Sequence, residues 1–115
     1  MAKDQLFLLA APFVDEKLGD ALWYCPHCAL VEMALTLNPH WAEKIDVHRV
    51  AFPRPRPAVI ALVGEAEQSL PTLVFADAAT APEGARIANG NAFLKGGAEI
   101  ATALAHRYGG VAPHP

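Results

Sequence analysis

The chain is short of charge, and the charge it carries is slightly acidic. Charged residues make up 18% of its 115 residues, and nine lysines and arginines face twelve aspartates and glutamates, for a net charge of −3. Proteins that bind nucleic acid present an excess of basic side chains, so this balance argues against a nucleic-acid partner. No apolar run approaches the ~20 residues that cross a bilayer, and we expect no membrane partner.

Cysteine is equally scarce, whereas hydrophobic residues are plentiful. The two cysteines cannot make a multi-disulfide scaffold and are too few for an all-cysteine zinc site. Hydrophobic residues make up 53% of the chain, so a buried core is available and disorder is not expected. Length and composition together predict a single small domain, residues 1–115, of the α/β or α+β class.

The first residues are apolar but do not match a secretion signal. One lysine lies beside an aspartate at the start, and the run from Leu6 to Val14 ends at Asp15-Glu16-Lys17 rather than at a small-residue cleavage site. We therefore predict a buried strand here and a cytoplasmic protein whose thiols stay reduced.

Periodicity and turn residues predict elements in the order β-α-β-α-β-β-α. The predicted strands span residues 5–10, 45–52, 72–76 and 85–88, and the predicted helices span residues 26–37, 57–63 and 97–108. The first two strands should be parallel, and the last two should form a hairpin with a long connection. The sum is a four-stranded mixed sheet with helices on both faces. Residues 12–24 are expected to be irregular, and the tail from residue 111 is expected to fray.

The two cysteines form one motif, Cys25-Pro26-His27-Cys28, at a predicted helix start. A helix N-terminus stabilises a thiolate through unpaired N–H groups and the positive end of the helix dipole. We expect Cys25 to be the exposed attacking thiol and Cys28, one turn further in, to resolve the mixed disulfide. Pro26 fixes the backbone at the first helical position, and a protonated His27 would stabilise the thiolate.

Three uses of this cysteine pair stay open. A Cys-x-x-Cys pair that follows a strand and opens a helix favours thiol–disulfide exchange. Alternatively, Cys25 and Cys28 bind zinc or an iron–sulfur cluster, with His27 or a second subunit completing the site. In the third case the chain is an interaction protein with inert cysteines.

The order of motifs resembles the thioredoxin superfamily. The resemblance lies in a strand, Cys25-Pro26-His27-Cys28, a helix, a strand, a helix, and then Leu70-Pro71 directly before a strand. It implies a thioredoxin-like three-layer α/β/α sandwich and a thiol–disulfide oxidoreductase that requires no cofactor and acts on protein or small-molecule thiols and disulfides. It further implies that Pro71 is a cis-proline facing the cysteines and that the Leu70 backbone pairs with a bound thiol substrate.

Finer resemblances point to several branches of that superfamily. Residues 70–74 and 100–110 are similar to glutaredoxins and to the N-terminal domain of glutathione transferases, which bind the γ-glutamyl group of glutathione at the start of the last helix. The matching positions here are Gly96 and Gly97, where backbone N–H groups would bind a carboxylate, so glutathione stays open as a co-substrate. The motif itself resembles periplasmic disulfide oxidases. The whole chain looks most similar to an uncharacterised bacterial family, the DUF3088-like proteins.

Four residues outside the motif are further candidates for substrate binding. Trp23 and Tyr24 either form an apolar rim beside the motif or pack in the core, and core packing is the commoner use of aromatics at a helix start. Arg54 and Arg56 either attract the carboxylate of a small thiol or belong to a solvated loop, which we favour. We expect a monomer or a weak homodimer.

Overall fold

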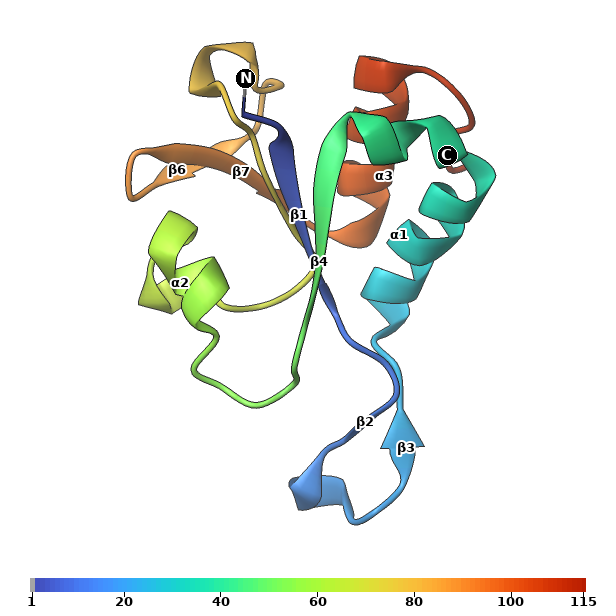
Figure 1. Cartoon of the computed structure of the whole chain (residues 1–115), viewed down its shortest axis with the longest axis vertical. Coiled ribbons are helices and arrows are strands. Elements are labelled where there is room, and N and C mark those ends of the chain that lie inside the picture. The colour runs from blue at the N-terminus through green and yellow to red at the C-terminus, as the bar shows by residue number, and fades with distance from the viewer. Residues whose placement is uncertain (1) are drawn as a thin grey trace.

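A mixed sheet runs through the middle of the computed structural model, which describes residues 2–115 (Figure 1). Its five strands lie in the order β4-β1-β5-β7-β6, and β1 pairs in parallel with β4, whereas β1–β5, β5–β7 and β7–β6 are antiparallel. The strands are β1 (Asp4–Leu9), β4 (Ile45–Val50), β5 (Thr72–Val74), β6 (Arg86–Ala88) and β7 (Asn91–Lys95). The described part of the chain therefore has an α/β fold.

The interior strand β1 is apolar on both faces, and this explains the layers. Leu6 and Leu8 pack into the cluster that holds the buried faces of α1 (Pro26–Leu37) and α3 (Gly97–Tyr108). Phe7 points the other way and packs against α2 (Pro57–Val63). Figure 1 shows α1 and α3 on one side of the sheet and α2 on the other. The expected helices on both faces are confirmed.

The three helices begin and end where the sequence predicts. α1 and α2 each have proline in the first turn, and α2 and α3 end at glycines in the positive-φ region, Gly64 at φ 89° and Gly109 at φ 79°. Within residues 2–115, none of the helices combines the length and apolar composition needed to cross a membrane.

The far edge of the sheet corrects two predictions. The sheet has five strands rather than four, because residues 91–95 form β7. β7 is the strand that pairs with β5, so the predicted hairpin between residues 72–76 and 85–88 is wrong. The turn between β6 and β7 is Asn89-Gly90, with φ of 54° and 80°, a pair that suits a two-residue hairpin loop. That dipeptide was the available signal for a second strand after residue 90.

Residues 12–24, which we call the arm, are more regular than expected. They form a two-stranded antiparallel ribbon of β2 (Phe13–Val14) and β3 (Leu22–Trp23), joined through the 3₁₀ turn Glu16–Leu18. The arm projects from the end of the molecule where β1 stops and α1 begins (Figure 1). The Phe13 ring stacks on Phe52, with 4.4 Å between the ring centroids. This contact joins the arm to the loop after β4.

The start of the C-terminal tail is anchored, which corrects the expectation that it frays from residue 111. The buried Asn38 side chain accepts a hydrogen bond from Val111 N at 2.7 Å and donates to Val111 O at 3.0 Å. The Trp41 indole donates to Gly109 O at 2.8 Å. The residue that ends α1 thus holds the chain that follows α3.

Candidate active site

Both cysteines lie where β1 ends and α1 begins. Cys25 is the N-cap of α1 with extended backbone angles, and Pro26 takes the first helical position. Cys25 is partly exposed, and its Sγ accepts a hydrogen bond from the Cys28 backbone N–H, with 3.2 Å between N and S. His27 is exposed on the first turn. The cap position thus directs one of the free N–H groups of the helix at the outer sulfur.

Cys28 has a contrasting environment in the core. It is 2% exposed, and its Sγ accepts a hydrogen bond from Leu9 N at 3.4 Å. Burial raises the pKa of Cys28 to about 12, with the Leu9 hydrogen bond opposing the shift and Cys25 adding to it. The two thiols therefore differ in access, and Cys28 stays protonated near neutral pH.

A groove of about 320 Å³ opens beside the two sulfurs. The end of β1 forms one wall through Leu9, α1 forms the other through Met33, and Tyr24 stands at the motif end. Glu32 also lines the groove, and its carboxylate accepts hydrogen bonds from Arg49 Nε at 2.9 Å and Arg49 Nη2 at 2.7 Å. This bidentate pair lowers the pKa of Glu32. The groove is otherwise lined mainly by apolar atoms.

The Leu70–Pro71 peptide bond is cis, as the resemblance implied. Pro71 is buried directly before β5, and the register of Phe7 with Thr72 brings it to the end of β1 that carries the motif. Leu70 packs against the core cluster that includes Cys28 and that Cys25 contacts. The structure therefore brings the predicted Leu70-Pro71 pair to the cysteine end of the sheet.

Gly97 approaches the motif through its backbone. It is buried, and a Cβ placed on it would lie 2.5 Å from the carbonyl oxygen of His27. The missing side chain lets the first turn of α3 lie directly against the first turn of α1. The structure therefore gives Gly97 a packing role beside the motif, on the side of α1 that faces α3.

The solvated-loop interpretation is wrong for Arg56, whereas Arg54 is exposed in the loop after β4. Arg56 is 4% exposed; its guanidinium donates to Gln68 O at 2.9 Å and to Phe52 O, and its backbone N donates to the Gln68 side chain at 2.7 Å. Burial lowers the pKa of Arg56, and the nearby cysteines partly offset the shift. Because Gln68 lies two residues before Leu70, Arg56 ties the loop after β4 to the segment that leads into the cis bond.

The core-packing interpretation is wrong for both aromatics. Trp23 is 42% exposed and Tyr24 is 67% exposed. Trp23 lies on β3, and Tyr24 lines the groove with both cysteines. Tyr24 thus lies beside the motif, where the rim alternative expected it, whereas Trp23 lies on the arm.

Some residues of the site were not predicted from the sequence. The sequence spacing could have placed Glu32 at the site, because Glu32 lies four residues after Cys28 and so on the same face of α1. No sequence pattern could have placed Leu9 or Gln68 there, since each reaches the site only through the packing of distant segments.

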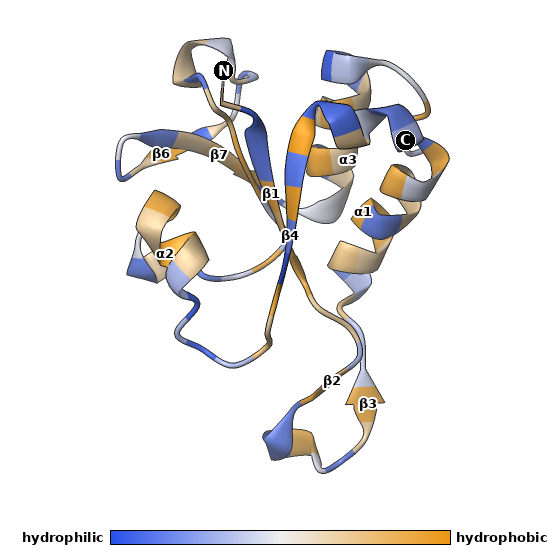
Figure 2. Cartoon of the chain, in the orientation of Figure 1, coloured by the Kyte–Doolittle hydropathy of each residue, from blue (hydrophilic) through white to orange (hydrophobic). Residues whose placement is uncertain are grey.

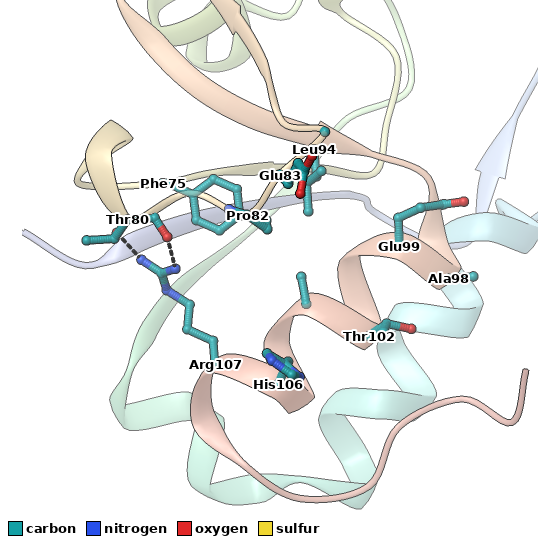
Figure 3. Close-up of a pocket in the computed structure, with 12 residues that line it drawn as sticks. Phe75, Thr80, Pro82, Glu83, Leu94, Ala98, Glu99, Thr102, His106 and Arg107 are labelled. Atoms are coloured by element: carbon teal, nitrogen blue, oxygen red, sulfur yellow. Dashed lines mark hydrogen bonds between the residues drawn. The ribbon is translucent and has the colours of Figure 1, made fainter.

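A larger cavity, about 680 Å³, lies along α3 and apart from the cysteines (Figure 3). Phe75 and Leu94 line it together with one face of the helix. The guanidinium of Arg107, at the edge of the cavity, is already paired within the protein. Its Nη1 donates to Thr80 O at 2.8 Å, and its Nε lies 3.0 Å from the buried Asp4 carboxylate. Across the described residues, 2–115, no three histidine, cysteine, aspartate or glutamate side chains are grouped to hold a metal ion.

Comparison with known proteins gives one family. Residues 3–112 match a family described as "Protein of unknown function (DUF3088)". The comparisons with curated proteins and with solved structures gave no match.

Proposed function

Because the chain belongs to the DUF3088 family, whose description names no activity, we propose a function from the site itself: thiol–disulfide exchange by Cys25 and Cys28. One observation carries the proposal. The outer thiol caps a helix and accepts an N–H hydrogen bond, whereas the inner thiol, one turn later, is buried with a raised pKa. An accessible nucleophile beside a protected partner is the arrangement that stepwise disulfide exchange needs.

The reaction proceeds in two displacements. The Cys25 thiolate attacks one sulfur of a substrate disulfide, and the second substrate sulfur leaves as a thiolate. Cys28 then loses its proton to solvent and attacks Cys25 Sγ, so that the Cys25–Cys28 disulfide forms and the remaining substrate thiolate leaves. Two electrons pass from the protein dithiol to the substrate, and the reverse sequence oxidises a substrate dithiol.

The structure supports a timing for the second step. The negative charge of Cys25 is one cause of the raised Cys28 pKa. When Cys25 becomes part of a mixed disulfide, that charge disappears and the Cys28 pKa falls. Deprotonation of Cys28 is thus favoured at the stage when its thiolate is used.

The chain order of the elements supports placing this chemistry on a thioredoxin-like scaffold. Strand β1 leads through the motif to α1 and β4, α2 leads to β5, and β7 precedes α3. The cis Leu70–Pro71 bond at the cysteine end of the sheet is consistent with the same scaffold. Pro71 and Leu70 would then present backbone to a bound thiol substrate.

The proposal is tested by counting thiolates released from an aromatic disulfide under anaerobic, metal-free conditions. Reduced wild-type protein should release both aromatic thiolates per molecule, because Cys28 resolves the mixed disulfide. Cys28→Ser should release one and retain the other on Cys25, as read by mass, and Cys25→Ser should react slowly. Equal, slow reaction of both cysteines contradicts the proposal, and metal titration of the same variants then tests zinc or iron–sulfur binding.

A further inference from the structure

Most of the exposed hydrophobic side chains lie on the two segments that flank the cysteine motif, the arm and α1. Of the ten large ones exposed within residues 2–115, five belong to the arm and three to α1. The arm residues are Val14, Leu18, Leu22, Trp23 and Tyr24, and the α1 residues are Leu30, Met33 and Leu37. Figure 2 shows the apolar colour of β3 in the arm. Clustered apolar exposure of this kind marks an interaction surface, whereas scattered exposure does not.

The groove beside the sulfurs continues this apolar surface. Tyr24 and Met33 line it and also belong to the exposed set. No lysine, arginine or histidine is among its lining residues within the described chain, and Glu32 is already paired with Arg49. The two carboxylates of a small charged thiol such as glutathione find no basic side chain among these lining residues. An apolar occupant fits the lining better.

The groove and Pro71 lie on different sides of α1. Glu32 reaches Arg49 on β4, so the groove opens on the β4 side of the helix. Gly97 and α3 pack against the motif on the other side, toward β5. The groove is therefore separate from the backbone contact that the cis Pro71 would make with a bound substrate.

The arm also offers unpaired main chain next to Cys25. Its ribbon has two strands, and among the described residues β3 pairs with β2 alone, which leaves its second edge without a strand. Residues 22–23 lead within two residues to Cys25. An extended polypeptide that pairs with this edge would run directly into the cysteine.

The charge of the arm selects among such polypeptides. The turn and its flanks hold Asp15, Glu16 and Asp20 against one lysine, Lys17. Basic side chains on a partner would therefore be attracted beside the apolar contacts.

We infer that the arm and the groove form a docking surface for an extended, apolar polypeptide segment that carries a cysteine in a disulfide and flanking basic residues. The inference rests on the proposed function and names its substrate class. In the exchange, Cys25 bonds to the sulfur of the docked segment, the other substrate sulfur leaves as a thiolate, and Cys28 then releases the segment as a thiol while the Cys25–Cys28 disulfide forms.

The test compares two mixed disulfides that share one coloured leaving group, 5-thio-2-nitrobenzoate. One is a synthetic apolar peptide with a central cysteine and a lysine at each end, and the other is glutathione. Release of the coloured thiolate gives both rate constants. We expect the peptide to react about 10-fold faster with the wild-type protein, the size of effect that a few buried anchor side chains supply.

The matched variants are Leu22→Ser and Ile87→Ser. The two side chains have nearly equal exposure, 68% and 67%, and Ile87 lies on β6, away from the arm. Leu22→Ser should lower the peptide-to-glutathione rate ratio by about 5-fold, because it removes apolar contact area, and Ile87→Ser should leave the ratio unchanged.

The outcomes separate the two proposals. Equal rates for the two probes, or equal ratios in the two variants, overturn the docking surface and leave the exchange function standing. A peptide with glutamates in place of the lysines should react more slowly than the lysine peptide. An equal or faster reaction overturns the inference that basic residues flank the substrate cysteine. Failure of Cys25 to react with either probe overturns the proposed function and this inference with it.

Discussion

Gly97 determines how closely α3 approaches the cysteine motif. Gly97→Ala would place a Cβ 2.5 Å from the His27 carbonyl oxygen, which is backbone and cannot rotate away. One helix must therefore shift, and we expect a loss of about 2 kcal/mol in the free energy of unfolding, measured in urea. The exposed Thr102→Ala, on the same helix, is the control and should change it by less than about 0.5 kcal/mol. A Gly97→Ala protein as stable as wild type would show that the contact yields without strain.

Cys28 makes stability depend on alkaline pH. Its pKa is raised from 9.0 to about 12 in the folded protein, so the unfolded chain loses this proton first as pH rises. The stability it contributes is complete below pH 9.0 and is lost as pH rises toward about 12, by up to ~1.4 kcal/mol per pH unit. Cys28→Ala should remove this slope, as urea titrations at pH 8 and ~10 would measure. Parallel pH profiles for the two proteins would contradict the assignment.

The Glu32 carboxylate, one turn further along α1, affects the pKa of the same thiol. Its negative charge is one of the causes that raise the pKa of Cys28. Glu32→Gln should therefore lower that pKa, and Cys28 should alkylate faster at a fixed alkaline pH. Mass analysis of each cysteine after a short exposure to iodoacetamide measures the effect. Asp46→Asn, an exposed change on β4, is the control. If Cys28 is alkylated at the same rate in both variants, the Glu32 charge does not affect the pKa of Cys28.

At the scale of elements, the Phe13–Phe52 stack joins the arm to the loop after β4. Phe13→Ala removes the ring that stacks on Phe52 at 4.4 Å, and a two-stranded ribbon is marginally stable by itself. Amide hydrogen exchange across residues 13–24 should accelerate, with little change in β1 or α1. Val14→Ala, on the exposed face of the same strand, should have a smaller effect. Acceleration spread over the whole sheet would show that the arm is part of the core.

The elements that the sequence predicted well are those whose ends are marked by local residues such as proline and glycine. The helix bounds follow from Pro26, Pro57 and the glycines after α2 and α3, and the cis Pro71 was implied by the resemblance to the thioredoxin superfamily. The ribbon and β7 were missed because two- to five-residue strands are defined by their partners rather than by periodicity. The same reason hid the burial of Arg56, whose partner Gln68 is twelve residues away.

At the scale of the whole molecule, Asn38 connects the end of α1 to the chain after α3. Asn38→Ala would remove hydrogen bonds to Ala34 O, Val111 O and Val111 N from a buried side chain. We expect the free energy of unfolding to fall by about 3 kcal/mol, because polar groups lose their partners away from water. Deletion of residues 112–115 keeps Val111 and should lower stability by less than about 0.5 kcal/mol. If the deletion matched Asn38→Ala, the tail rather than the amide would be the source of the stability.

The arm is inserted between β1 and α1, and its strands share no ladder with the central sheet. Its length and side chains can therefore be altered without changing the strand order of the central sheet. If the arm binds the partner as inferred, changes in the arm would alter which partner is bound and would leave the Cys25-Cys28 pair in place.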